Sequence, residues 1–363
     1  MRVLVVTAQY PVPERPSYGV FVAEQVRSLQ ASGVDVEVLF FNAKRNRLNY
    51  ALSFPRIIRA LASGRHDIVH THHTYTMLLV AAARALTRRR VPVVLTNHEG
   101  EVTDPQMRTR TWHPTSRLRH SLLVKRAAAR RADFLVMVSS RAAAALAVKT
   151  PHEVIPCGVD LVKFSPLNRA ECRAALGIAS DAVVIFFPAG PRAEGKRFQL
   201  AETTFGLVRA RVPRAILLTA GNIPHDSMPL YYSAADVVLQ CSYFEASPTV
   251  VKEALACEVP IVSTDSGDTR EVVAGVPNCY VTGDDPEQLA ARILDCVGRR
   301  AVGGPDHLRR KGLSLEQTAQ RIVRVYETIL DGRVSHALGH GEGTRHVVDP
   351  PAAAVHSGAE PDP

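Results

Sequence analysis

Short apolar runs alternate with amphipathic stretches along the first 160 residues of the chain. A short apolar run bounded by turn-forming residues is typical of a buried strand in a parallel sheet. The runs that fit are Val3–Thr7, Val36–Phe40, Ile68–His70, Val93–Asn97 and Phe134–Val138. The hydrophobic spacing between them predicts helices over Val20–Ser32, Met77–Leu86 and Arg126–Ala132. This alternation predicts βαβ units that build a parallel sheet.

The pattern pauses at Ile155–Asp160 and then restarts, which predicts a second α/β unit. Its expected strands are Val183–Pro188, Ala215–Thr219, Val237–Gln240, Pro260–Ser263 and Cys279–Val281. Its expected helices are Phe198–Val212, Met228–Ala235, Thr249–Cys257 and Pro286–Val297. A last amphipathic helix is expected over Leu315–Leu330, and the sequence beyond 333 is rich in Gly, His, Pro and Ala.

The chain has 363 residues, which exceeds one compact core and suits two domains of about 150 residues. We therefore expect an α/β protein with two Rossmann-like domains, residues 1–158 and 159–315, joined near 158–180. Residues 316–332 would form a helix that packs back toward the first domain, and 333–363 a disordered tail. Ligands of open α/β sheets bind outside the carboxyl ends of the strands, so the chemistry is sought just after each strand.

Composition indicates a folded protein of the cytoplasm. Apolar residues make up 46% of the chain, yet no apolar run reaches the roughly 18 residues that cross a bilayer. The N-terminal apolar run is shorter than the core of a signal peptide and fits a first strand. The six cysteines form no C-x-x-C pair, and we expect them to be small buried hydrophobic residues rather than disulfides or zinc ligands.

Positive charge is concentrated in the first domain. Residues 1–150 hold 23 Lys and Arg against 9 Asp and Glu, a net charge of +14, whereas the whole chain carries +9. Much of the excess lies in residues 108–131. A basic domain suggests an anionic partner, such as a phosphorylated acceptor, an acidic lipid surface or nucleic acid. A solvated basic surface with no such partner explains the charge equally well.

The segment Ser242–Cys257 carries the strongest candidate chemistry. It follows an expected strand, and Ser247 and Pro248 suit the N-cap and first position of a helix. Glu245 would then precede the helix and Glu253 would lie one to two turns inside it. A helix N-terminus suits a diphosphate, and a carboxylate can hold two vicinal hydroxyls. A plain helix cap with surface glutamates fits as well, and a glycosidase would need both carboxylates to flank one bond.

Two common nucleotide-binding motifs are missing from the sequence. No G-x-G-x-x-G follows the first strand and no Walker A sequence occurs, which weakens the dehydrogenase and nucleoside-triphosphatase interpretations. His70, His72 and His73 cluster, but their spacing is a poor match to zinc sites, and we expect no metal.

Several motifs resemble those of glycosyltransferase family 4. Glu245 and Glu253, with seven residues between them, precede an Ala-x-Ala-Cys-x-x-Pro-Ile-Val-Ser-Thr-Asp run that resembles the donor-binding signature of that family. Four further segments are similar to family motifs: Asp67–His72, Thr96–Gly100, Ile155–Asp160 and Tyr231–Asp236. The resemblance covers residues 1–331 and implies the GT-B fold, in which two Rossmann-like domains face each other across a cleft.

The resemblance also implies roles for individual residues. Glu253 would bind the ribose hydroxyls of a nucleotide-sugar donor, and Glu245 would contact hydroxyls of its sugar. Arg192 and Lys196 would bind the diphosphate and offset the charge of the leaving group, although two such cations on a loop are often merely solvated. His98 would lie beside the donor sugar, or it has a structural role. Further donor contacts would come from Gly19, Gly190, Ala246, Ser247 and Pro248.

The sequence also departs from the family pattern. Cys157 replaces the usual Asn of the hinge motif, and Ala246 replaces the usual Gly after the first glutamate, which restricts how closely the backbone approaches a ligand. After Leu217–Gly221 the chain runs directly into Asn222–Asp226, without the helix and strand that most members insert. The chain therefore resembles a subgroup with a shortened C-terminal domain, whose sheet should be smaller.

The resemblance implies a retaining, metal-independent hexosyltransferase of bacterial glycan or natural-product biosynthesis. It would move a sugar from a nucleoside-diphosphate donor, UDP before GDP, to a hydroxyl of a glycan, lipid-linked or small-molecule acceptor. The nucleotide sugar is a substrate, so no cofactor is expected. The first domain would contact an anionic membrane at the inner face, and no nucleic acid is expected. The alternatives are a nucleotide-sugar hydrolase or epimerase and a non-catalytic binder or membrane scaffold.

Overall fold

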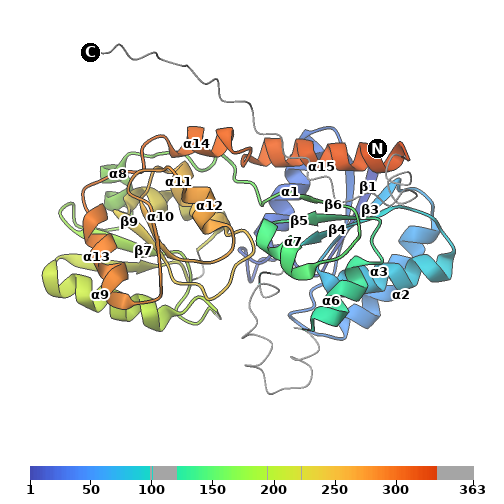
Figure 1. Ribbon diagram of the computed structural model, residues 1–363, viewed down its shortest axis with the longest axis horizontal. Helices are drawn as coiled ribbons and strands as arrows, with labels where there is room; N and C mark the ends of the chain where they lie inside the picture. The colour runs from blue at the N-terminus through green and yellow to red at the C-terminus, as the bar shows by residue number, and fades with distance from the viewer. Residues whose placement is uncertain (99, 101–120, 194, 222, 333–363) are drawn as a thin grey trace, which may run out of the picture.

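Two parallel sheets, each flanked by helices on both faces, lie side by side in the computed structural model (Figure 1). The structure describes residues 1–98, 100, 121–193, 195–221 and 223–332. The expected tail and the part of the basic segment before Ser121 therefore lie outside the described residues. Two parallel α/β domains facing each other confirm the expected GT-B fold class.

The first sheet has six strands in the order β2-β1-β3-β4-β5-β6. Their bounds are β1 Arg2–Thr7, β2 Asp35–Phe40, β3 Ile68–His72, β4 Val93–Asn97, β5 Phe134–Met137 and β6 His152–Val154. Apolar runs fill the central strands because both faces of a parallel sheet are covered by helices.

Different helices cover the two faces of this sheet. One face packs against α2 (Asn49–Ala62), α3 (Thr74–Thr87), α6 (Leu122–Ala129) and α7 (Ser140–Leu146). The other packs against α1 (Val20–Ala31) and α15 (Leu315–Leu330). Helix α15 is the last element of the described chain, and in Figure 1 it lies along the N-terminal half. Tyr326 in α15 is fully buried, and its hydroxyl lies 2.5 Å from Nδ1 of His70 in β3.

The second sheet has five strands in the order β11-β10-β9-β7-β8. Their bounds are β7 Val183–Phe187, β8 Ala215–Thr219, β9 Val237–Gln240, β10 Ile261–Thr264 and β11 Tyr280–Thr282. One face packs against α9 (Phe198–Arg211) and α13 (Pro286–Cys296). The other packs against α10 (Met228–Ala234), α11 (Thr249–Ala256), α12 (Thr269–Val273) and α14 (Gly304–Arg310). Helix α8 (Arg169–Ala175) follows the hinge in the chain and contacts α10.

The structure contains elements that the hydrophobic pattern does not predict. Helix α2 is not among the helices expected from the sequence. It contains Pro55, yet the helix continues through the proline and buries Ile57 and Leu61. Burial of these two side chains outweighs the missing backbone hydrogen bond. Strand β6 is short and only half-buried, so it carries no apolar run.

Candidate functional site

Loops from the two halves meet at the carboxyl ends of their strands. The backbone N–H of Cys157, in the hinge between the halves, donates to Oγ of Ser247 at 3.3 Å. Gly100, which follows β4, lies so close to Glu245 that an added Cβ would overlap the backbone of Glu245. Segments from opposite halves are therefore in contact at the candidate site.

Glu253 is a buried carboxylate of α11 with three donors around it. Its Oε2 accepts from the hydroxyl of Tyr232 at 2.7 Å, and its Oε1 lies 3.1 Å from Nε2 of His225. Thr249 supplies a further side-chain hydrogen bond. Burial alone would raise the pKa of Glu253, but the hydrogen bonds and the positive charge of His225 outweigh it and lower the pKa. Glu253 is therefore ionised at neutral pH.

Glu245 lies after β9 and pairs with Lys196, the lysine of the loop between β7 and α9. Both side chains keep some contact with solvent, with exposed fractions of 19% for Glu245 and 33% for Lys196. A pair that is partly exposed can exchange partners at little cost, because water screens each charge while they separate. The structure thus brings together Glu245, expected at the donor sugar, and Lys196, expected at the donor diphosphate.

Ser247 does not cap α11 as expected. The helix begins at Thr249, Pro248 occupies the N-cap position, and no side chain caps it. The hydroxyl of Ser247 instead donates to Oδ2 of Asp268 at 2.6 Å and lies 2.5 Å from Nζ of Lys252. These charged groups are stronger partners than a backbone N–H, which explains why the serine turns away from the helix end. Ala246 and Ser247 are both buried.

His98 follows β4 and uses both ring nitrogens. Its Nε2 lies 3.0 Å from Nδ1 of His72, and its Nδ1 lies 3.7 Å from Sγ of Cys157. Burial raises the pKa of the Cys157 thiol to about 11, so the sulfur keeps its proton and can donate it to His98. Burial, and then the nearby His73 and His70, lower the pKa of His98, so the ring is neutral. His98 then donates from Nε2 to His72.

Helix α1 brings the first half to the same place. Gly19 at its N-cap has a φ of 70°, and an added Cβ would overlap the backbone of Gln9 and Tyr10. Only glycine meets both demands without strain. This turn places Phe21 with its ring 4.6 Å from that of His98. One turn on, Glu24 is buried and contacts His225 of the second half.

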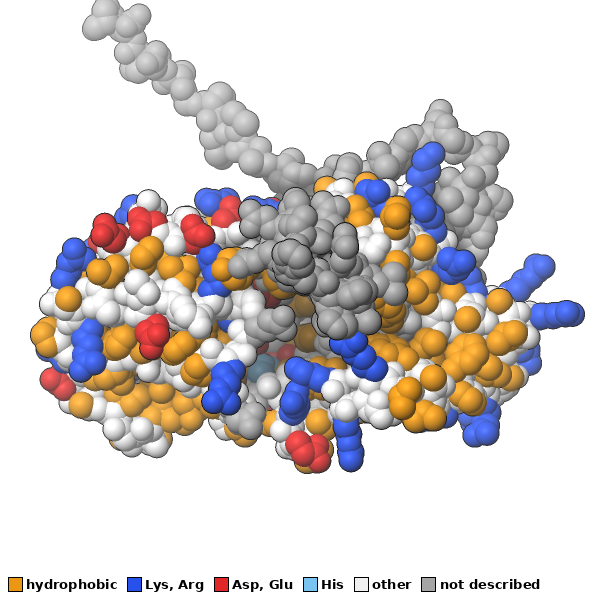
Figure 2. Space-filling model, turned by 90° about the horizontal axis from the view of Figure 1, so that it is seen from below, with side chains coloured by type: hydrophobic (Ala, Val, Ile, Leu, Met, Phe, Trp, Pro, Cys, Tyr) orange, Lys and Arg blue, Asp and Glu red, His pale blue; other side chains and the backbone are white. Residues whose placement is uncertain are grey.

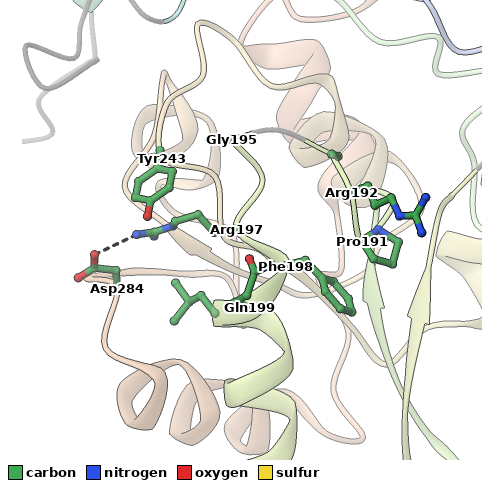
Figure 3. A pocket seen from close by; sticks show the side chains of 10 residues that line it. Pro191, Arg192, Gly195, Arg197, Phe198, Gln199, Tyr243 and Asp284 are labelled. Carbon is green, nitrogen blue, oxygen red and sulfur yellow. Dashed lines mark hydrogen bonds and ion pairs between the residues drawn. The ribbon is translucent and has the colours of Figure 1, made fainter. Parts of the chain in front are cut away.

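Arg192 lies apart from these residues, on the loop after β7. It is exposed, has no hydrogen-bond partner among the described residues, and lines a cavity of about 430 Å³ (Figure 3). In the same cavity Arg197 pairs with Asp284 at 2.9 Å and stacks on Tyr243, so its charge is already compensated. Gly190 lies on the same loop, where an added Cβ would come within 3.3 Å of Gly221.

Sequence reasoning missed the residues that contact Glu253, its partner His225, and Ser247. These are Glu24, Lys163, His225, Tyr232, Lys252 and Asp268. Asp268 and His225 do follow strand ends, β10 and β8, where ligand contacts gather. The described part of the chain contains no group of three or more His, Cys, Asp or Glu that could hold a metal ion. Nor does any of its helices have the length and apolar character needed to span a membrane.

The sequence matches two family models that divide the chain as the two sheets do. Residues 1–163 match Glycosyltransferase Family 4, and residues 184–299 match Glycosyl transferases group 1.

Two sequence relatives and one solved structure agree with these matches. A D-inositol 3-phosphate glycosyltransferase of Geodermatophilus obscurus is 30% identical over 213 residues, which cover 48% of this chain and 46% of the relative, less than half its length. The putative teichuronic acid biosynthesis glycosyltransferase TuaC of Bacillus subtilis is 25% identical over 356 residues, covering 81% of this chain and 88% of TuaC. The structure of Anabaena HepE in complex with UDP superimposes with a TM-score of 0.59 at 17% identity, covering 93% of this chain and 100% of HepE.

Proposed function

Because this chain belongs to glycosyltransferase family 4, we propose that it is a retaining transferase that moves a sugar from a nucleoside-diphosphate donor to a hydroxyl acceptor. One observation carries the proposal: α11 holds a buried, ionised carboxylate, Glu253, which accepts hydrogen bonds from three donors. A second carboxylate, the partly exposed Glu245, precedes it by eight residues. The proposal assigns Glu253 to the ribose hydroxyls and Glu245 to the sugar hydroxyls, the roles that the resemblance implies.

The remaining charged residues suit the departing diphosphate. Lys196 can exchange Glu245 for a phosphate oxygen, and the N-terminus of α11 supplies backbone N–H groups that no side chain caps. Arg192 would donate two hydrogen bonds from its planar guanidinium to the diphosphate once the loop after β7 turns toward it. Positioned charge of this kind usually contributes the largest catalytic term, and losing one donor often costs about 2.7–4 kcal/mol.

The neutral His98 would contact the donor sugar rather than the diphosphate. Both ring nitrogens have protein partners, so a hydrogen bond to a sugar hydroxyl would require His98 to give up His72 or Cys157, and the neutral ring would add no charge. Same-face attack, with the donor phosphate as base, would need no side-chain nucleophile. Retention is tested by the anomeric configuration of the product, read by NMR, and metal independence by full activity in EDTA.

The donor site is tested by thermal unfolding with UDP, GDP, ADP and dTDP. UDP comes first because HepE, which shares the fold, was solved with UDP. A ligand at a hundredfold excess over Kd stabilises the native state by about 2.7 kcal/mol, which raises the Tm of a domain of ~150 residues by several degrees. The shift should vanish in Glu253→Ala. No shift with any of the four would contradict the proposal, and free sugar or an epimer as product would identify a hydrolase or epimerase instead.

We also propose that the first half binds an anionic membrane through a basic apolar face, formed by the exposed leucines and arginines of α2, α3 and α6 and their flanks. The exposed leucines are Leu48, Leu52, Leu86 and Leu123. The exposed arginines are Arg45, Arg47, Arg56, Arg59, Arg88, Arg89, Arg90 and Arg130. Figure 2 shows hydrophobic side chains among Lys and Arg over this half of the molecule. Exposed apolar side chains among basic ones favour an acidic bilayer surface.

Sedimentation with phosphatidylglycerol vesicles tests this contact. Leu52→Glu and Leu123→Glu should each weaken binding about tenfold, since burying a leucine contributes about 1.5–3 kcal/mol. Val302→Glu, at an equally exposed position of the second half, is the control. Binding that neither leucine variant changes would refute the proposed face.

A further inference from the structure

A cluster of charged side chains crosses between the two halves beside Glu253. His225, in the turn of 3₁₀-helix η2 (His225–Ser227) after β8, places Nε2 at 3.1 Å from Oε1 of Glu253 and Nδ1 at 3.2 Å from Oε1 of Glu24. Nζ of Lys163, just after the hinge, lies 2.8 Å from the same Nδ1. We call Glu24, Lys163, His225 and Glu253 the clasp. Both glutamates are buried, with exposed fractions of 5% and 3%.

His225 is a cation at neutral pH. Burial alone would lower its pKa, but the hydrogen bonds to Glu24 and Glu253, together with their negative charges, raise the pKa to about 9. An imidazolium donates from both nitrogens, so Nδ1–H serves Glu24 and Nε2–H serves Glu253. Lys163 cannot donate to a protonated Nδ1, and its partners are then Asp226 at 2.6 Å and Glu24 at 3.5 Å.

Charged and titratable groups reach His225 from every element packed around it. They are Glu24 and Arg27 of α1, Lys163 after the hinge, Asp226 of its own turn, Tyr232 of α10 and Glu253 of α11. Of the described donors to Glu253, Tyr232 and Thr249 are neutral hydroxyls, and only His225 brings a positive charge. Without that charge, burial would favour the protonated form of Glu253, which offers one acceptor fewer to a hydroxyl.

We propose that His225 is a positioning residue for the donor nucleotide: it holds Glu253 ionised for the ribose and, through Glu24, ties this carboxylate to the opposite half. The proposal rests on the function proposed above. The short connection after β8 is what places a histidine here, since β8 ends at Thr219 and the turn of His225 begins only six residues later. Binding of the nucleoside is thereby coupled to the approach of the two halves.

The test is the Kd of UDP, GDP, ADP and dTDP, measured by calorimetry from about pH 6 to about pH 10. His225→Gln should weaken binding of the nucleotide that the wild type prefers about tenfold or more, the effect of a lost hydrogen bond to a charged group. His225→Lys restores a cation and should recover most of the affinity. A purely structural histidine would not be rescued by lysine.

Glu24→Gln supplies a second, independent readout. The wild type should lose affinity as the pH rises through about 9, where His225 gives up its proton. Removing the negative charge of Glu24 lowers the pKa of His225, so the same loss should occur at lower pH in Glu24→Gln. The matched control is His66→Gln, because His66 pairs with Glu37 at 3.0 Å at the far side of the first sheet. This control should bind as the wild type does.

Three outcomes would overturn the inference. His225→Gln could bind the nucleotide as tightly as the wild type or more tightly, which would make the histidine a spectator or a competitor. Glu24→Gln could keep the pH profile of the wild type, which would remove the link between the halves. A wild type that binds none of the four nucleotides would overturn the proposed function itself, and the role of His225 with it.

Discussion

Replacing Lys252 by methionine tests how the donor loop is held. Lys252 in α11 is fully buried, and its Nζ lies 2.5 Å from Oγ of Ser247 and 3.4 Å from Oδ2 of Asp268. The other carboxylate oxygen of Asp268, Oδ1, is buried and has no hydrogen-bond partner among the described residues. Methionine keeps the volume but removes the charge, so Asp268 would remain as a buried, uncompensated anion.

The expected loss of stability is large. Breaking a buried ion pair by removing one partner costs about 3–5 kcal/mol, because the remaining charge stays desolvated. For domains of about 150–250 residues each kcal/mol lowers the Tm by about 2–4 °C, so Lys252→Met should unfold roughly 6–20 °C below the wild type. Scanning calorimetry and urea unfolding would measure the change. The loop of Ser247 should also lose order, so nucleotide binding should weaken in parallel.

The double variant Lys252→Met with Asp268→Asn separates the charge from the packing. Removing both charges should recover much of the lost stability, since no buried ion is left without a partner. A single variant within about 1 kcal/mol of the wild type would refute the reasoning, because it would mean that Asp268 is not desolvated. A double variant as unstable as Lys252→Met alone would show that the shape of the lysine matters, and not its charge.

Three further variants test the rest of the site. Glu253→Gln should raise the Kd of the donor nucleotide about tenfold or more by removing a charged acceptor, and an unchanged Kd by calorimetry would contradict this. Gly100→Ala should push the halves apart, because its Cβ would overlap the backbone of Glu245; small-angle scattering should show a larger radius of gyration, and an identical radius would argue against the close approach. The pKa of His225 is raised to about 9, so its stabilisation is complete below pH 6.5 and is lost as the pH rises through about 9. Urea unfolding should show that the free energy of unfolding of the wild type falls by up to about 3 kcal/mol more over that range than that of His225→Gln. An equal fall in both proteins would contradict a charged histidine.

The central strands of both sheets could be predicted because they are apolar runs covered on both faces, whereas the short, half-buried β6 could not. Local sequence was enough for Val93–Asn97 or Val237–Gln240, whose side chains are all buried. It was not enough for α2, where Pro55 argues against a helix and only packing against the sheet overrides it. The prediction that Ser247 caps α11 was wrong for a related reason. The preference of serine for a helix end is local, but Lys252 and Asp268 compete for its hydroxyl.

The partners of the candidate residues could not be predicted because they are brought together by the fold. Glu24 and His225 are about 200 residues apart in the chain and belong to different halves, yet Nδ1 of His225 donates to Oε1 of Glu24. No spacing rule connects such a pair. A histidine after β8 and a glutamate inside α1 look like ordinary polar residues until both are buried against Glu253.

The two carboxylates of the donor signature differ chiefly in the cation that each one holds. Glu245 pairs with Lys196, a long side chain that is one-third exposed and can move to a phosphate without leaving a buried charge behind. Glu253 pairs with His225, whose side chain is only 14% exposed and is held from the other side by Glu24, so separating them would leave two buried anions without a cation. The first pair is therefore suited to exchange during each cycle of transfer. The second pair is suited to persist through the cycle. We therefore expect the contacts of the Lys196 loop to change during each transfer, while the contacts of Glu253 in α11 stay the same.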